Sequence, residues 1–257
     1  MKLFLIKNKR KKILLLLVLY LVLCLFLSWQ NLILKSVFYQ KSWVHRVNSI
    51  EKMNIVSNSF NGVEIDIIYN KKENFFDVNH PPAKSINLSL EKLITSTKNK
   101  NKLNYWLDFK NLTKENINYS LNRLNSISNS FQINKKNIIV ESKNPEFLKL
   151  FLENGYKTSY YLPSNLNTNK DVLKIAIQKS KNYKTTYLSS DIKQFKVISK
   201  FFPNEKIITW SYNLKHELYF NPIKIFKKIK SFIQKFNVLN NNKIDVVLFS
   251  SKTEGSR

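Results

Sequence analysis

Cysteine and glycine are both scarce in this chain of 257 residues, which contains one cysteine, Cys24, and three glycines. A single cysteine excludes an intrachain disulfide and any zinc site built from cysteines. The few glycines exclude a glycine-rich phosphate loop, and neither a GxGxxG nor a Walker A pattern is present. Any phosphate chemistry must therefore be sought outside the nucleotide-binding motifs.

Acidic residues are also few, since 17 Asp and Glu stand against 43 Lys and Arg and give a formal net charge of +26. Such an excess is expected of a nucleic-acid-binding protein. However, Lys, Asn and Ile are abundant along the whole chain, and basic blocks are confined to the N-terminus and residues 224–230. Charge that is spread in this way favours attraction to anionic lipid or to phosphate-bearing substrates over nucleic-acid binding. The 43% of apolar residues suffices for a sizeable core and excludes a disordered protein.

The N-terminus joins a basic cluster to an apolar run. The cluster lies between positions 2 and 12 and consists of Lys2, Lys7, Lys9, Arg10, Lys11 and Lys12. Residues 13–27 are uncharged and apolar, at the short end of the ~17–25 residues of a spanning helix. The cluster predicts a cytoplasmic N-terminus, with the rest of the chain on the other side of the membrane. Cys24 is expected to be an ordinary lipid-facing residue of this run.

No small-residue cleavage site follows the apolar run, which favours an uncleaved signal-anchor over a removed signal peptide, although both remain open. We therefore expect a basic cytoplasmic segment at residues 1–12, a single-pass membrane anchor at 13–34 and one extracytoplasmic globular domain at 40–252.

The globular part alternates β-rich runs with helical patterns. The expected strands are residues 43–47, 63–69, 103–109, 137–141, 158–162, 185–188, 206–211 and 244–249. The expected helices are residues 50–60, 88–97, 114–127, 145–154, 170–181, 192–201 and a stretch within 222–236. Alternation of this kind indicates a parallel sheet with right-handed crossovers, and eight strands are the number that closes a (β/α)8 barrel of the TIM type. An open doubly wound sheet is the alternative; polar residues at strand ends favour closure.

Turn and capping residues mark several of the expected boundaries. Pro145 stands at the start of a helix and Gly155 after its end, the usual asymmetry of these two residue types. Gly62 is expected to stop the preceding helix in the same way. Asn169 and Asp191 offer capping side chains to the two helices that follow them.

Charged and polar side chains gather at the ends of the first three expected strands, where such barrels carry their active sites. The first strand ends in His45 and Arg46. On the second strand, Glu64 and Asp66 share one face while the alternate apolar residues share the other. Two carboxylates pointing into a barrel need compensation, and a divalent cation such as Mg²⁺ or Ca²⁺ supplies it.

The third strand repeats this arrangement. Asp108 and Lys110 face inward, so that Asp108 can add a third carboxylate ligand and Lys110 a point charge for a phosphate oxygen. His80 follows the second strand in a loop with two prolines, and His45 and His80 together suit a general acid and a general base. The third histidine of the chain, His216, is expected to begin a helix without a catalytic role.

Each of these features alone has a plainer interpretation, since an isolated Glu-x-Asp is typical of a solvated sheet edge. Their combination on three successive strand ends favours function. Glu141 at the end of the fourth strand is either a further lining group or a partner of Lys110. Trp210 is either a wall for an apolar part of the substrate or a core residue.

The same residues carry a resemblance to a known family. His45-Arg46, Glu64-x-Asp66, His80 and Asp108-x-Lys110 resemble the active-site pattern of glycerophosphodiester phosphodiesterases, in the phospholipase-C-like phosphodiesterase superfamily. The order and spacing of the segments at 43–49, 63–66, 79–82 and 107–110 are more similar to the menorin family of that superfamily. The specific part covers residues 43–111.

The resemblance implies a divalent metal held by Glu64, Asp66 and Asp108, with His45 and His80 as the acid–base pair. Arg46 and Lys110 would hold the phosphate. Two departures accompany it: Val47 stands where these phosphodiesterases usually have glycine and would crowd the phosphate loop, and Asp108 replaces a more usual glutamate.

We therefore expect a metal-dependent phosphodiester hydrolase that acts on a glycerol- or lipid-type phosphodiester at the membrane surface. The alternative is a non-catalytic module that uses the barrel mouth to bind a phosphorylated ligand or a glycan.

Overall fold

The structure, a computed structural model, describes residues 2–213 and 222–250. Its contacts divide the chain into two compact units, one formed by residues 1–38 with 214–241 and the other by residues 39–213 with 242–257. The first unit is helical and the second is a barrel. His216, expected to begin a helix, lies outside the described residues.

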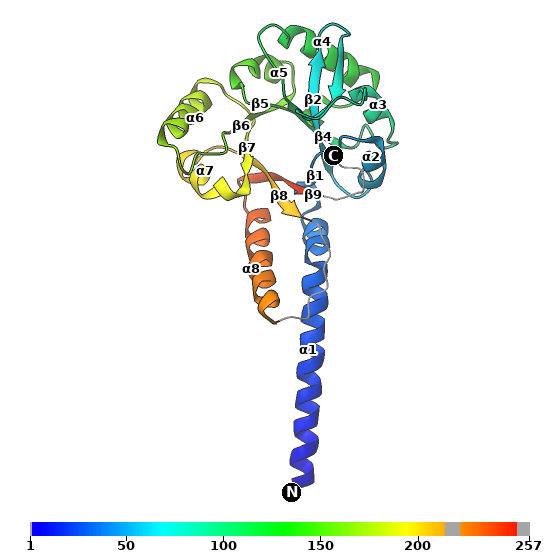
Figure 1. Ribbon diagram of the computed structural model, residues 1–257, viewed down its shortest axis with the longest axis vertical. Helices are drawn as coiled ribbons and strands as arrows, with labels where there is room; N and C mark the ends of the chain where they lie inside the picture. Colours follow the sequence, from blue (N-terminus) through cyan, green and yellow to red (C-terminus); the bar gives the residue numbers. More distant parts are fainter. Residues whose placement is uncertain (1, 214–221, 251–257) are drawn as a thin grey trace. The chain divides into compact units, whose positions relative to one another are not determined.

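The barrel closes through its first strand. Within the described residues the eight parallel strands are β1 (Ser42–Val44), β2 (Gly62–Asn70), β4 (Asn104–Phe109), β5 (Ile138–Ser142), β6 (Lys157–Tyr161), β7 (Tyr187–Asp191), β8 (Ile207–Asn213) and β9 (Ile244–Ser250). Strand β1 pairs in parallel with both β2 and β9, so the sheet has no parallel edge left open (Figure 1). The expected closed (β/α)8 barrel of the TIM type is confirmed, and the open sheet is excluded.

Helices alternate with the strands around the barrel. They are α2 (Ile50–Val56), α3 (Leu90–Thr95), α4 (Ile117–Ser130), α5 (Lys149–Glu153), α6 (Lys170–Asn182) and α7 (Phe195–Phe201). Asn169 caps α6 by accepting from the backbone N–H groups of Asp171 and Val172. Asp191 accepts from Lys193 N at the start of the short turn before α7. Gly155 follows α5 with φ +90°, a conformation that favours glycine.

One further strand, β3 (Phe75–Val78), was expected to be loop. It runs antiparallel to β2, with Ile67 opposite Val78 and Tyr69 opposite Phe76. The strand forms because Phe76 and Val78 both bury their side chains. Asn79 N donates to Asp66 O over 3.1 Å directly after it. This hairpin carries the chain back along β2 to the level of Asp66 and so fixes the place of His80.

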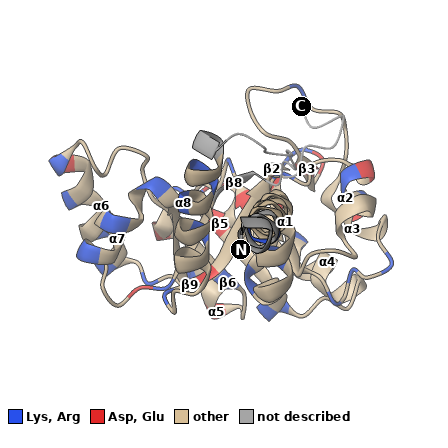
Figure 2. Ribbon diagram, turned by 90° about the horizontal axis from the view of Figure 1, so that it is seen from below, with Lys and Arg blue, Asp and Glu red and all other residues tan. Residues whose placement is uncertain are grey.

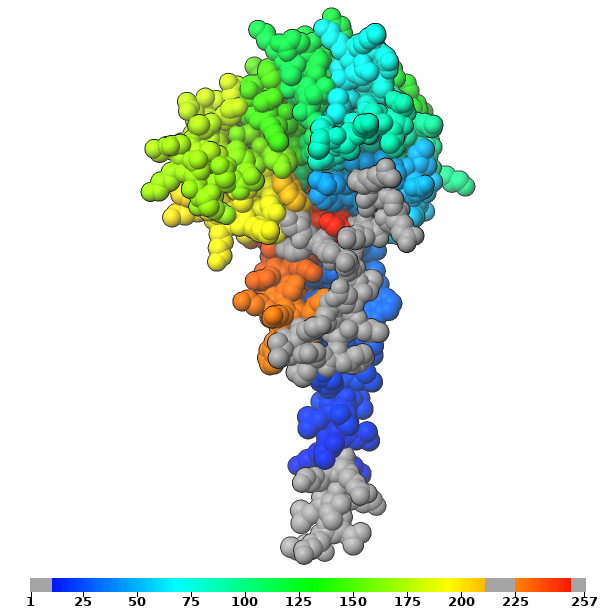
Figure 3. All heavy atoms as spheres, viewed as in Figure 1, coloured from blue at the N-terminus to red at the C-terminus, as the bar shows by residue number. Residues whose placement is uncertain are grey.

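Apolar side chains fill the interior of the barrel. The cluster comprises Trp43, Trp106, Ile139, Tyr187, Ile208, Val246 and Leu248, with Trp210 packed against it. The ring of strands seen in the ribbon drawing is accordingly filled with atoms in the space-filling view (Figure 3). Trp106 and Leu248 of this cluster, and Trp210 against it, also line the cavity that holds the charged residues described below.

Basic residues are scattered over several of the outer helices, whereas acidic residues also lie among the central strands (Figure 2). This distribution agrees with the spread of Lys along the sequence and shows no basic stripe in that view.

The helical unit pairs α1 (Lys2–Val37) with α8 (Pro222–Leu239). Within residues 11–37 of α1, a stretch of 18 residues reaches a mean hydropathy of 2.5, so this helix is long and apolar enough for a membrane span. Cys24 is 2% exposed because it packs with Leu27 against Ile225 of α8. The expectation that Cys24 faces lipid is therefore wrong: the apolar run contacts a protein helix at this position.

Gly62 begins β2 and does not act as the expected helix stop. Glycine is required at position 62 for a steric reason, because an added Cβ would lie 2.4 Å from Trp43 Cδ2. We expect Gly62→Ala to lower the free energy of unfolding by about 1–3 kcal/mol through overpacking. Thermal unfolding of the full chain in detergent measures it. In a Trp43→Leu background the same substitution should cost less, and an equal cost in both backgrounds would contradict the account.

Candidate active site

The strand register aligns the acidic residues at the carboxyl end of the barrel. Asp66 of β2 lies beside Asp108 of β4, and Asp108 lies beside Glu141 of β5. Glu64 is two residues before Asp66 and points to the same face. These side chains line a cavity of about 80 Å³, together with His45, Arg46, His80, Trp106, Lys110, Tyr161, Trp210 and Leu248. The structure thus brings together every site residue expected from the sequence.

Three of the carboxylates converge closely enough to share one ion. One oxygen each of Glu64, Asp66 and Asp108 lies within 4.8 Å of the others. Glu64 and Asp66 are 2% and 1% exposed, so water screens their charges little. Burial raises the pKa of Glu64 well above its usual range, and the neighbouring charges of Asp66 and Asp108 raise it further. A divalent cation fits this set, because hard cations take carboxylate oxygens and would relieve the repulsion.

Lys110 compensates part of this negative charge. Its Nζ lies 2.6 Å from Asp66 Oδ1 and also contacts Asp108 Oδ2. Burial alone would lower the pKa of Lys110, but Asp108 and Asp66 outweigh burial and raise it. The pKa of Asp108 is still raised, chiefly by burial. The Lys110 ammonium is thus shared by the carboxylates of Asp66 and Asp108. Among the described residues, it forms no ion pair with Glu64.

Arg46 holds Glu64 through its backbone. Arg46 N donates to Glu64 Oε2 over 2.5 Å, and Val47 N donates to Glu64 O over 2.8 Å. Arg46 adopts φ 55°, in the left-handed region that non-glycine residues rarely occupy. Strain of this kind persists where the surrounding contacts over-determine it, often at functional sites. Val47 itself is fully buried and lines neither cavity described in this section, so it does not crowd the site as expected.

The two histidines lie on different sides of Arg46. His45 Nε2 is 3.8 Å from Glu64 Oε2. Burial, followed by the charge of Arg46, lowers the pKa of His45 to about 4, so its imidazole is neutral at neutral pH and can accept a proton. His80 Nε2 accepts a hydrogen bond of 3.2 Å from Arg46 Nη2, since a guanidinium can only donate.

Asn48 is a site residue that sequence reasoning missed. Its Nδ2 donates to Asp66 Oδ2 over 2.6 Å, and its Oδ1 accepts from Asp66 N over 3.0 Å. The two contacts fix both the backbone and the carboxylate of Asp66. The only sequence signal was its place two residues after Arg46, and an uncharged amide has no pattern of its own.

Glu141 is a buried lining group. Ser189 Oγ donates to its Oε1, and Ser159 Oγ donates to the same atom over 3.5 Å. These serines on β7 and β6 were not anticipated. Burial and the charge of Asp108 raise the pKa of Glu141 well above its usual range. Of the two interpretations of Glu141, the contacts favour lining over a direct pair with Lys110.

Trp210 packs on the core and also lines the small cavity, while its contact with substrate stays a prediction. Its ring stacks on Tyr161 with centroids 5.2 Å apart, and both residues line the 80 Å³ cavity. It also packs edge-on against Trp106 of the core, with centroids 6.4 Å apart. Tyr161 was not expected in the site; its place at the end of β6 is the signal that could have found it.

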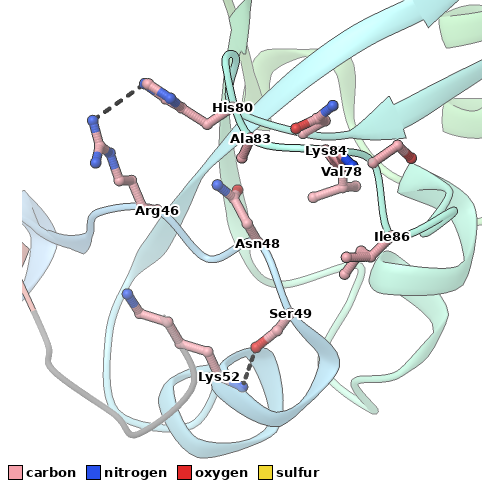
Figure 4. A pocket seen from close by; sticks show the side chains of 11 residues that line it. Arg46, Asn48, Ser49, Lys52, Val78, His80, Ala83, Lys84 and Ile86 are labelled. Atoms are coloured by element: carbon pink, nitrogen blue, oxygen red, sulfur yellow. Dashed lines mark hydrogen bonds between the residues drawn. The ribbon is translucent and has the colours of Figure 1, made fainter. Parts of the chain in front are cut away.

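A second cavity of about 460 Å³ adjoins the first (Figure 4). Arg46 and His80 line both cavities, and the hydrogen bond between their side chains lies where the two meet. Asn48 and Ser49 extend the lining of the larger one toward α2.

No protein-family model matches the chain, and no curated protein matches it in sequence. Solved structures do match its fold. The glycerophosphodiester phosphodiesterase from Parabacteroides distasonis superposes with a TM-score of 0.53 at 14% identity, covering 82% of this chain and 92% of that one. A phosphodiesterase from Oleispira antarctica, in complex with the product sn-glycerol-3-phosphate, gives 0.51 at 11% identity, covering 84% and 94%. The barrel is therefore similar in fold to glycerophosphodiester phosphodiesterases.

The contacts of Asn48 predict an effect on metal affinity. We expect Asn48→Ala to weaken Mn²⁺ binding about 10–100-fold, because the Asp66 carboxylate loses the group that orients it. Titration of the full chain in detergent, followed by electron paramagnetic resonance, measures this. Asn154→Ala is the matched control, since Asn154 donates to Leu150 O away from the site. Unchanged Mn²⁺ affinity in a folded Asn48→Ala protein would contradict the expected role.

Proposed function

We propose that this chain is a metal-dependent phosphodiester hydrolase of the menorin type that acts on a glycerol- or lipid-type phosphodiester. The observation that carries the proposal is the convergence of three carboxylates, two of them buried, with two imidazoles and two basic side chains on one small cavity. Its position at the carboxyl end of a barrel similar in fold to glycerophosphodiester phosphodiesterases supports the same reaction class.

Glu64, Asp66 and Asp108 would hold the divalent metal, Mg²⁺ or Ca²⁺. Such an ion supplies Lewis-acid polarisation of a phosphoryl oxygen and lowers the pKa of a nearby hydroxyl. Arg46 and Lys110 then bind the remaining phosphate oxygens. Lys110 is already held beside the carboxylates, so its charge is positioned before substrate binds.

The two histidines would carry out the two proton transfers of the reaction. His45 is neutral at neutral pH and takes the proton of the attacking hydroxyl. His80 protonates the leaving alcohol. Its Nε2 accepts from Arg46 in this structure, and a bound phosphate would compete for the same guanidinium and free Nε2 to carry a proton. Arg46 thereby links phosphate binding to the acid role of His80.

The N-terminal helix would anchor this activity to a membrane as a single-pass signal-anchor. Nine apolar side chains within residues 13–22 of α1, among them Leu14, Leu16 and Val22, are 49–65% exposed and suit contact with lipid. The basic cluster before this run would remain in the cytoplasm, so that the barrel acts on the other side at the membrane surface.

Hydrolysis by the full chain tests the proposed activity. With Mg²⁺ or Ca²⁺ we expect turnover of glycerophosphodiesters, and loss of about 10²–10⁴-fold in kcat for His45→Gln. Glu64→Gln should abolish both turnover and metal stimulation. Asp245→Asn is the control, because Asp245 pairs with Lys206 outside the site.

The opposite outcome is equally specific. Bound metal without turnover of any phosphodiester in a broad panel would contradict the enzymatic proposal. Metal-dependent binding of a phosphorylated ligand or glycan that survives loss of both His45 and His80 would then identify the chain as the non-catalytic module.

The topology has its own test in a Cys24→Ala background. We expect a membrane-impermeant maleimide to label Ser130→Cys, at the end of α4, in intact cells. It should label Asn8→Cys only after the cells are opened. The reverse pattern would contradict an extracytoplasmic barrel. Release of a shortened protein from the membrane would identify a cleaved signal peptide.

A further inference from the structure

The 460 Å³ cavity beside the carboxylate site is basic. Its lining includes Arg46, Lys52 and Lys84 together with Asn79, His80 and Ser85. Among the described residues that line it, none is Asp or Glu. The volume lies in the range of small-molecule sites. In Figure 4 the side chains of Arg46 after β1, Lys52 of α2 and His80 after β3 border the same space.

Because Lys52 is buried, the positive charge of this cavity is unfavourable unless a ligand is bound. The residue is 4% exposed, and its Nζ donates to His45 O over 2.9 Å. An ammonium has three donors, and in the described part of the chain no carboxylate lies within ion-pair distance of this one. Glu64 and Asp66 favour its charge from beyond ion-pair distance but do not offset its burial in full, so a bound anion would stabilise this cation.

The position of the cavity assigns it to one part of the substrate. Arg46 and His80 line both cavities, so one molecule can reach from the carboxylate cluster past these side chains into the basic space. Under the proposed function His80 protonates the leaving alcohol. The basic cavity therefore lies on the side of the leaving group.

We propose that the basic cavity binds a second anionic group, so that the preferred substrate is a phosphodiester whose leaving alcohol carries a further phosphate. This inference rests on the proposed function and deepens it by naming the substrate class. Phosphate suits the cavity because Arg46, Lys52 and Lys84 supply charged donors, while Asn79 adds an uncharged amide to the lining.

The test compares two soluble substrates with the full chain in detergent. Glycerophosphoglycerol has one phosphate, and bis(glycerophospho)glycerol has a second phosphate on the leaving side. We expect kcat/KM to be about tenfold higher or more for bis(glycerophospho)glycerol than for glycerophosphoglycerol. This ratio exceeds the statistical advantage that its two equivalent phosphodiester groups give. Lys84→Met should bring the ratio of the two values down to that statistical advantage. Lys72→Met, which removes an exposed lysine in the β2–β3 turn, should leave the ratio unchanged.

Two further arms complete the design. Phosphatidylglycerol and cardiolipin in mixed micelles repeat the comparison with acylated molecules, and a higher kcat/KM for these identifies a lipid headgroup as the source of the second phosphate. Lys52→Gln provides a second pocket variant, with thermal unfolding as the check on its fold. It should also lower the substrate ratio.

Failure of this inference differs from failure of the proposed function. Equal kcat/KM values for the two soluble substrates, or a Lys84→Met effect of the same size on both, would overturn the second anion site and leave the hydrolase intact. If neither substrate turns over, calorimetric binding decides. Tighter binding of the two-phosphate molecule that depends on Lys84 supports the cavity as an anion site, and equal binding overturns it.

Discussion

Three carboxylates forced into one poorly hydrated space are the constraint on which this site depends. Burial, together with the neighbouring carboxylates, raises the pKa of Glu64 and of Asp108, so the charged forms need positive charge nearby. Lys110 satisfies two of the three, while Arg46 N and His45 lie next to Glu64. The remaining deficit of positive charge is what makes a divalent cation, followed by a phosphate, a fitting occupant.

The barrel supplies the geometry that creates this constraint. Parallel pairing of β2 with β4 sets Asp66 directly beside Asp108, and closure through β1 brings His45 and Arg46 to the same mouth. The antiparallel β3 then returns the chain so that His80 meets Arg46. Because each of these strands is buried, the charged groups are held by backbone register, and side-chain freedom plays a small part.

Much of this arrangement could be predicted from alternation in the sequence. The apolar residues at 63, 65 and 67 fix which face Glu64 and Asp66 share, and the same rule places Asp108 and Lys110. Eight strand-like runs were enough to favour closure. Two features of the site could not be predicted in this way. The positive φ of Arg46 and the hydrogen bond from Asn48 to Asp66 depend on local conformation, which leaves no periodic pattern in the sequence.

Other features depended on partners that a linear pattern cannot name. Residues 75–78 are expected to belong to the loop that carries His80, yet pairing with β2 makes them a strand. Cys24 sits in an apolar run that suits lipid and helix equally well, and only the structure shows Ile225 against it. Lys52 is likewise one lysine among many in the sequence, and burial alone distinguishes it.

The most direct test of the central claim is anomalous diffraction from crystals of the full chain soaked in Mn²⁺. The account predicts one strong peak at roughly 2.0–2.6 Å from oxygens of Glu64, Asp66 and Asp108. A protein saturated with Mn²⁺ elsewhere, with no peak between these three carboxylates, would contradict it.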